Sequence, residues 1–216
     1  MLLSNMEQTP QPHFSRHKIK SSTRGLVIGY TQTLSARVCR LYLRLNAGYE
    51  VRNDVHFVDT KPYLFIANHQ SRIDPFVTFA LLSLRENFQI KPVRFMTARG
   101  IYFSPLRPML KLLGCYPTRR QGVDSIDLSA QYLAQGYGVM IFPEGRRTLR
   151  SESDPRPGIE RLVAASPAIA APVLVHIEWE VKNRFQKKPT VHLTEVSLDS
   201  LRNQTAKEIV EQVYAV

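Results

Sequence analysis

Residues 63–76 read YLFIANHQSRIDPF, an apolar run followed by a polar turn and a proline. The first five residues form a short, continuous apolar segment, which is typical of a buried strand. Pro75 is followed by FVTFALLSL, which predicts an apolar helix. Proline is favoured at the first position of a helix and aspartate just before it, so we predict Asp74 as the N-cap and Pro75 as N1. The stretch therefore predicts a strand, a tight turn and a helix.

The turn contains two side chains of chemical interest, His69 and Asp74. On a single helix their spacing would leave them far apart around the helix axis. If His69 leaves the end of a strand and Asp74 begins the next helix, the turn folds the two side chains toward each other. In open α/β sheets, ligands bind at the carboxyl ends of the strands. On this fragment alone, a helix cap beside an ordinary loop histidine is the favoured interpretation, because caps are common.

The rest of the chain alternates predicted strands with predicted helices. Four further apolar runs predict strands, namely VRFMTA (93–98), YGVMIF (137–142), APVLVHIEWE (171–180) and PTVHLTEV (189–196). Asp124 or Ser125 is placed to begin a helix that Gly136 ends. Thr205 and Glu208 form a capping box before the last helix. We therefore expect a single α/β domain with a mixed, mostly parallel sheet flanked by helices.

The N-terminal part divides into a basic tail and an amphipathic segment. Residues 1–25 are polar and basic, which predicts a mobile tail. Residues 26–48 carry apolar side chains at helical spacing, namely Val27, Tyr30, Leu34, Val38, Leu41 and Leu45. Such a stripe packs a helix on the core of its own domain, or it lies in a membrane interface with arginines near the lipid headgroups. Both interpretations stay open, and one helix can serve both.

Composition narrows the class of protein further. The chain has 216 residues, 29 Lys and Arg against 18 Asp and Glu, and a formal net charge of +11. Such a surface favours phosphates, anionic lipids or nucleic acid as partners. Cys39 and Cys115 form no disulfide framework or zinc motif and fit a reducing compartment. Neither a secretory signal nor a spanning apolar stretch is evident, so we expect a protein that does not cross a membrane but is free to lie on one.

A second motif, FPEGRRT at residues 142–148, also follows a predicted strand. Gly145 lets the backbone approach a ligand closely. Arg147 is suited to a bidentate grip on a phosphate, and Glu144 is placed to orient that arginine or to bind substrate hydroxyls. Alone, this string is typical of a solvated turn. Combined with the histidine and aspartate upstream, it indicates a binding site.

The two motifs together resemble the glycerolipid acyltransferases typified by bacterial 1-acyl-glycerol-3-phosphate acyltransferase. The resemblance covers roughly residues 50–180. Asn68, His69 and Asp74 match the NHxxxxD block of that family. Residues 142–148 match its FPEGxRS block, with threonine in the place of the final serine.

Two weaker blocks add to the resemblance. Gly114, followed six residues later by Arg120, resembles a second block in which the arginine binds the phosphate of the acceptor. Arg119 competes for that role. Pro172 resembles the fourth block, whereas Arg146 departs from the small polar residue that is common at its position. These differences leave the reaction class in place and the acceptor's identity open.

The resemblance implies a mechanism and a set of site residues. His69 would act as general base on a glycerol hydroxyl that attacks an acyl thioester, with Asp74 fixing the imidazole, so no acyl-enzyme is required. No cofactor and no metal are implied, because the acyl donor is a co-substrate. The resemblance implies substrate-binding roles for Arg119, Arg120, Glu144, Gly145, Arg147 and Thr148.

The sequence therefore predicts a peripheral acyltransferase on the cytoplasmic face of a membrane, with an N-terminal interfacial helix and an acyltransferase domain over residues 49–216. Its expected partners are acyl-CoA or acyl-carrier protein, a 1-acyl-glycerol 3-phosphate acceptor and an anionic membrane surface. The alternative within this class is the same chemistry on glycerol 3-phosphate or another lysophospholipid. The alternative from another class, a basic nucleic-acid-binding domain, rests on charge alone, and we expect no nucleic acid as a partner.

Overall fold

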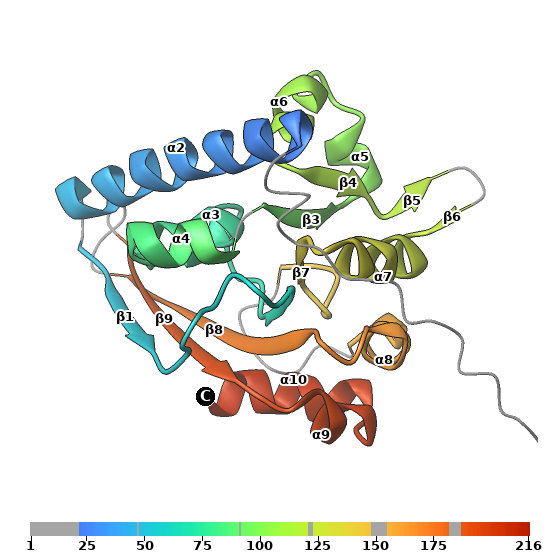
Figure 1. Cartoon of the computed structure of the whole chain (residues 1–216). Coiled ribbons are helices and arrows are strands. Elements are labelled where there is room, and N and C mark those ends of the chain that lie inside the picture. Colours follow the sequence, from blue (N-terminus) through green and yellow to red (C-terminus); the bar gives the residue numbers. More distant parts are fainter. Residues whose placement is uncertain (1–21, 47, 91, 121–122, 148–154, 182–186) are drawn as a thin grey trace, which may run out of the picture.

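The protein is described by a computed structural model covering residues 22–46, 48–90, 92–120, 123–147, 155–181 and 187–216. Its centre is a seven-stranded sheet (Figure 1). In sheet order the strands are β1 (Glu50–Asn53), β9 (Lys187–Glu195), β8 (Ala171–Val181), β2 (Tyr63–Ala67), β7 (Gly138–Ile141), β3 (Val93–Thr97) and β4 (Cys115–Pro117). Among these described strands only the β8–β9 pair is antiparallel, which confirms the predicted mixed, mostly parallel sheet.

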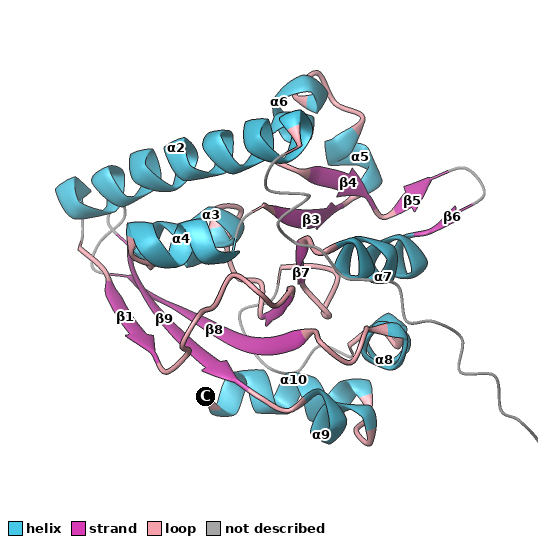
Figure 2. Ribbon diagram, viewed as in Figure 1, coloured by secondary structure: helices cyan, strands magenta, loops and turns pink. Residues whose placement is uncertain are grey.

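Helices cover both faces of this sheet (Figure 2). One face carries α2 (Thr23–Asn46), α3 (Asp74–Leu81) and α4 (Leu84–Ile90). The other carries α7 (Ser125–Gln135), α8 (Gly158–Ala165), α9 (Leu198–Arg202) and α10 (Ala206–Ala215). Two short helices, α5 (Arg99–Tyr102) and α6 (Arg107–Leu112), and a hairpin of β5 (Arg119–Arg120) and β6 (Val123–Asp124) lie beside β4. No helix among the described residues combines the length and apolar character needed to cross a bilayer.

Strand β2 shows why its sequence is apolar throughout. Tyr63, Phe65 and Ala67 join the core cluster beneath α2 and α3, whereas Leu64 and Ile66 join the cluster beneath α7, α8 and α10. All five side chains are fully buried, because a central strand between two helical layers has no solvent face. The continuous apolar run therefore predicted the strand correctly.

The predicted caps of α7 and α10 are confirmed. The carboxylate of Asp124 accepts a hydrogen bond from the Ile126 backbone N–H, and Gly136 follows the helix with a φ of 96°. Thr205 and Glu208 form the reciprocal bonds of a capping box before α10. Local sequence is sufficient here because each cap involves residues within one turn.

The predicted N-cap role of Asp74 is wrong. Helix α3 begins at Asp74 itself, its N-cap is Ile73, and Pro75 occupies the second position. The carboxylate of Asp74 accepts no capping bond from its own helix and points back toward the preceding turn. The helix is also shorter than the apolar run, since the chain turns after Leu81 and starts α4 at Leu84.

Strand β1 was not predicted from the sequence. It is an edge strand of the sequence EVRN, its side chains are mostly exposed, and it pairs in parallel only with β9 among the described strands. An exposed edge strand gains little from apolar side chains, so no apolar run marks it.

Helix α2 packs on the domain through the face opposite its apolar stripe. It buries Ile28, Ala36 and Leu43, together with the polar Gln32. The side chain of Gln32 donates to the carbonyls of Val93 and Leu113 at 2.6 and 2.9 Å and accepts from the Val93 N–H at 3.1 Å. The six apolar residues of the predicted stripe are all exposed, and their exposed fractions range from 42% at Val27 to 78% at Leu45.

Gly114 is required where α6 leads into β4. Its φ is +82°, a conformation that disfavours residues with a Cβ. An added Cβ would also lie 2.6 Å from the carbonyl oxygen of Val93 and 3.0 Å from Nε2 of Gln32. This glycine therefore lets the turn approach both β3 and the buried anchor of α2.

We predict that Gly114→Ala lowers the free energy of unfolding by at least ~1–3 kcal/mol, measured by denaturant titration, because it adds backbone strain to a backbone clash. Gly29→Ala is the matched control. Gly29 lies inside α2, and a methyl group added there would meet no atom within 4 Å, so alanine should be neutral or stabilising by up to ~1 kcal/mol. Equal stability of the two variants would contradict the close packing at Gly114.

Candidate active site

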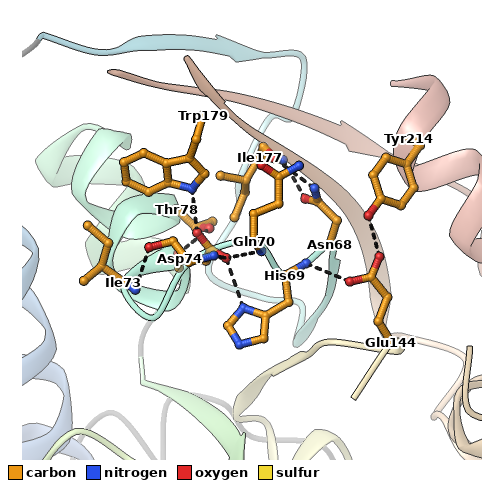
Figure 3. Close-up of polar contacts among 11 residues, drawn as sticks. Asn68, His69, Gln70, Ile73, Asp74, Thr78, Glu144, Ile177, Trp179 and Tyr214 are labelled. Atoms are coloured by element: carbon orange, nitrogen blue, oxygen red, sulfur yellow. Dashed lines mark hydrogen bonds and ion pairs between the residues drawn. The ribbon is translucent and has the colours of Figure 1, made fainter. Parts of the chain in front are cut away.

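The two sequence motifs meet at the carboxyl edge of the sheet (Figure 3). Strands β2 and β7 are parallel neighbours, and residues 68–74 and 142–147 follow their carboxyl ends. Strand β8 flanks β2 on the other side in the same direction. Three adjacent parallel strands therefore bring their last residues to one place, where open α/β sheets bind ligands.

Asn68 extends the pairing of β2 with β8 beyond the end of β2. Its side-chain amide donates to the carbonyl of Ile177 at 2.8 Å, and its side-chain oxygen accepts from the Ile177 N–H at 2.7 Å. The side chain thus replaces a backbone partner for Ile177, and only 2% of Asn68 is exposed. This bond pair fixes the point at which the chain leaves the sheet toward His69.

The predicted contact between His69 and Asp74 is confirmed. Nδ1 of His69 lies 3.0 Å from Oδ2 of Asp74, and the same oxygen accepts from the backbone N–H groups of Gln70 and Ser71 at 2.7 and 2.6 Å. Because a carboxylate only accepts hydrogen bonds, Nδ1 carries the proton. The other ring nitrogen, Nε2, is then the acceptor that can receive a proton from a ligand.

The imidazole of His69 is held on its face as well as at Nδ1. Its ring lies 4.3 Å from the ring of Phe142, with an angle of 31° between the planes. The histidine side chain is 22% exposed, whereas that of Asp74 has no exposed surface. A buried carboxylate therefore orients a partly exposed imidazole.

A residue that sequence reasoning missed completes the surroundings of Asp74. The indole Nε1 of Trp179 donates to Oδ1 of Asp74 at 2.9 Å. Side chains alternate along β8, so Trp179 points to the same face of the sheet as Val175 and Ile177. That alternation was visible in the sequence, but the partner 105 positions away was not.

Glu144 holds the backbone of the histidine. One carboxylate oxygen accepts from the His69 N–H at 3.2 Å, and the other accepts from the hydroxyl of Tyr214 on α10. Only 3% of Glu144 is exposed. The structure therefore places this predicted substrate-binding residue inside the protein, where it joins the turns after β2 and β7 to the last helix.

His176, with His192 beside it, lies close to Tyr214, the partner of Glu144. The ring of His176 lies 5.5 Å from that of Tyr214 and 6.1 Å from that of His192. Burial lowers the pKa of His176 because it disfavours the imidazolium, and the charge of His192 lowers it further. The neutral form of His176 is therefore the one that suits the packing against α10.

Exposed arginines lie on the outer side of the FPEG turn. Arg146 and Arg147 are both exposed. Gly145 has a φ of +65°, and a Cβ there would fall 2.4 Å from Nε of Arg156. The side chain of Arg156 therefore lies directly over the glycine, and its backbone N–H donates to the carbonyl of Pro143 at 3.0 Å. Arg156 is itself exposed, and no sequence signal singled it out.

Three predicted substrate-binding residues remain, namely Arg119, Arg120 and Thr148. Arg119 and Arg120 form β5, which follows the carboxyl end of β4 and so lies at the same edge of the sheet as the two motifs. Thr148 lies outside the described residues.

The two cysteines are poor candidates for a nucleophile. Burial raises the pKa of Cys39 to about 11 and also raises the pKa of Cys115. Both thiols are therefore protonated at neutral pH, which suits small packed residues better than nucleophiles. Among the residues that the structure describes, no group of three or more His, Cys, Asp and Glu side chains is placed to hold a metal ion.

The sequence of this chain matches a known protein family. A family described as Acyltransferase matches residues 48–176. The match includes both turns that form the site, and it ends three residues before Trp179 and well before Tyr214.

Individual curated proteins resemble this chain at low sequence identity and over only part of its length. The chain is 27% identical to a probable 1-acyl-sn-glycerol-3-phosphate acyltransferase of Mycoplasma pneumoniae over 52% of this chain and 43% of the relative. It is 30% identical to a chloroplastic 1-acyl-sn-glycerol-3-phosphate acyltransferase of Arabidopsis thaliana over 40% of this chain and 24% of the relative. The chain therefore spans less than half the length of these curated relatives.

A solved structure supports the fold. The crystal structure of the 1-acyl-sn-glycerophosphate acyltransferase PlsC from Thermotoga maritima superposes with a TM-score of 0.60, covering 91% of this chain and 82% of that chain. The sequences are 15% identical, so this likeness concerns the fold alone.

We predict that Asp74→Asn lowers the free energy of unfolding by ~1–3 kcal/mol, because an amide cannot accept at both positions. Whichever way the amide is turned, its NH2 group faces either the indole N–H of Trp179 or the N–H groups of Gln70 and Ser71. The measurement is denaturant unfolding followed by circular dichroism.

The control for this prediction is Asp124→Asn, at a true N-cap. Asparagine caps a helix as well as aspartate, and the exposed pair with Arg161 is weak, so stability there should change by less than ~1 kcal/mol. If both asparagine variants were equally stable, Asp74 would be no more than a helix-end residue.

Proposed function

Because the chain belongs to the Acyltransferase family, we propose that it transfers a fatty acyl group from a thioester donor to the free hydroxyl of 1-acyl-glycerol 3-phosphate, giving phosphatidate. The observation that carries this proposal is the contact between Nδ1 of His69 and the buried carboxylate of Asp74. The relatives named as 1-acyl-sn-glycerol-3-phosphate acyltransferases favour this acceptor over others. The donor is acyl-CoA or acyl-carrier protein.

In the proposed mechanism His69 is the general base. Nε2 removes the proton of the acceptor hydroxyl while its oxygen attacks the thioester carbonyl carbon, so a C–O bond forms and the C–S bond then breaks. The imidazolium returns the proton to the leaving thiolate. Asp74 stabilises the imidazolium and keeps Nδ1 protonated, which leaves Nε2 free to act as the acceptor.

The phosphate of the acceptor would be held by arginines at the same edge of the sheet. Arg147 is exposed directly after the turn that holds His69, and Arg156 lies over Gly145 beside it. Arg119 or Arg120 follows β4 at this edge, with Arg120 as the first choice from the spacing to Gly114. Fixing the phosphate in this way would set the free hydroxyl against His69, and positioning of this kind supplies several kcal/mol of a reaction barrier.

We predict that His69→Ala reduces acyl transfer by at least about 10²-fold, because the attacking hydroxyl loses its proton acceptor. The assay offers labelled acyl-CoA or acyl-carrier protein with lysophosphatidate, glycerol 3-phosphate or a lysophosphatidylcholine, and identifies each product by mass. His56→Ala, at an exposed histidine away from the site, is the matched control and should keep full activity. Transfer to none of these acceptors by the unaltered protein would refute the proposed function, and full activity of His69→Ala would refute the assigned base.

We also propose that the protein binds peripherally to an anionic membrane, at its cytoplasmic face. The exposed stripe of α2 meets a second exposed apolar group on α5, α6 and the turn between them, namely Ile101, Phe103, Leu106, Met109 and Leu112. The hydroxyl of Thr31 on α2 donates to the carbonyl of Leu112 on α6 at 2.5 Å. Helix α6 lies beside the N-terminal end of α2 (Figure 1). Apolar area of this extent, on a chain of net charge +11, favours an anionic lipid surface.

We predict that Leu34→Glu combined with Val38→Glu weakens binding to phosphatidylglycerol-containing vesicles at least ~10-fold, since two apolar side chains are lost from the interface. The two residues are 66% and 62% exposed, so the folded domain should tolerate the change. Ile169→Glu, an exposed apolar residue before β8, is the control and should bind as the unaltered protein does. Unchanged vesicle binding by the double variant, or equal binding to phosphatidylcholine vesicles, would contradict the proposal.

A further inference from the structure

We propose that Trp179 is a positioning residue for the base, and that its indole N–H fixes the carboxylate of Asp74 and, through it, the imidazole of His69. The proposal rests on the proposed function, because it assigns Trp179 a part in the same reaction. Trp179 would touch neither substrate nor the reacting atoms. Its effect would pass through one hydrogen bond.

The hydrogen bonds of Asp74 are divided unequally between its two oxygens. Oδ2 accepts from the ring of His69 and from two backbone N–H groups of the turn, while Oδ1 accepts from Nε1 of Trp179 at 2.9 Å (Figure 3). Asp74 has no exposed surface, so a carboxylate oxygen without a protein donor would lack solvation. The indole therefore supplies the donor on the side of the carboxylate that the turn does not reach.

This division has a consequence for His69. Three donors at a single oxygen compete for its lone pairs, and the carboxylate plane is free to rotate unless the second oxygen is also held. The bond to Trp179 opposes such a rotation. Because the imidazole is directed by Oδ2, a fixed carboxylate plane fixes the direction of Nε2 toward the acceptor hydroxyl.

The fold places Trp179 with the accuracy that such a role needs. Strand β8 is anchored two residues earlier by both side-chain bonds of Asn68 to Ile177. Beyond that anchor β8 stays paired with β9, where Trp179 lies opposite Pro189. The indole packs against the core cluster beneath α2 and α3, and its N–H is left directed at the start of α3. Trp179 also lies outside residues 48–176, the part of the chain that matches the family.

A purely structural role for Trp179 is the competing explanation, because a half-buried aromatic side chain packs as well as donates. Trp179→Phe separates the two roles, since it keeps most of the packed ring and removes the N–H. Trp179→Leu, which also lacks a donor, serves this purpose should the phenylalanine variant fail to fold. Tyr132→Phe is the matched control, because it removes a hydrogen bond to the buried Arg94 at 2.7 Å, on another part of the fold.

The first measurement does not depend on activity. A proton on Nδ1 of His69 bonded to a carboxylate gives a downfield proton resonance, which can be assigned by its loss in His69→Ala. We expect Trp179→Phe to broaden this resonance or shift it upfield, and Tyr132→Phe to leave it in place. An unchanged resonance in a folded Trp179→Phe protein overturns the proposal, whether or not the proposed reaction is observed.

The second measurement is a double-mutant cycle in turnover. We expect Trp179→Phe to lower kcat about 10-fold with little change in either KM, because one hydrogen bond to a charged group is lost. In the Asp74→Asn background the same change should cost little more, since the residue through which Trp179 acts is already altered. An equal loss of kcat in both backgrounds would show that Trp179 acts through packing or substrate. Absence of transfer by the unaltered protein would instead refute the proposed function and leave the resonance test decisive.

Discussion

The carboxylate of Asp74 is a charge with no exposed surface, and the elements around it supply its hydrogen-bond donors. Two come from the backbone of the turn, one from the ring of His69 and one from the indole of Trp179. A buried carboxylate is costly unless such donors are in place. The end of β2, the start of α3 and the outer part of β8 therefore have to meet in one arrangement. The position of His69 follows from satisfying this single buried charge.

A second buried carboxylate acts on the same histidine from the opposite side. Glu144 accepts from the backbone N–H of His69, whereas Asp74 accepts from its ring, so the main chain and the side chain are fixed separately. Glu144 is in turn held by Tyr214 on the last helix. The turn after β2, which contains His69, thus depends on the end of β7, on β8 and on α10, and these elements are far apart in sequence. This division reduces motion of both the backbone and the ring of His69, which suits the general-base role that we propose for it.

Sequence alone predicted the parts of this arrangement that are set locally. The buried strand from Tyr63 to Ala67 and the caps at Asp124 and Thr205 each depend on residues within a few positions. The contact of His69 with Asp74 was also predictable, because a strand that ends and a helix that begins leave few ways to connect them. Whether Asp74 also caps its helix was not predictable, since a capping aspartate and one that faces only the preceding turn have the same local sequence. Trp179 and Tyr214 reach the site across 105 and 70 positions, and such distances leave no local pattern.

Helix α2 shows a further limit of pattern and also links the surface to the site. Spacing identified an apolar stripe but not the side on which it lies, because the buried face is anchored by the polar side chain of Gln32. The exposed apolar stripe of this helix is buried only when another apolar phase covers it. Its inner face contributes Gln32 and Ala36 to a small apolar pocket of about 10 Å³ that Pro75 and Phe76, the residues after Asp74, also line. If a bilayer covers the outer face as we propose, one helix separates the lipid phase from the pocket at the start of α3.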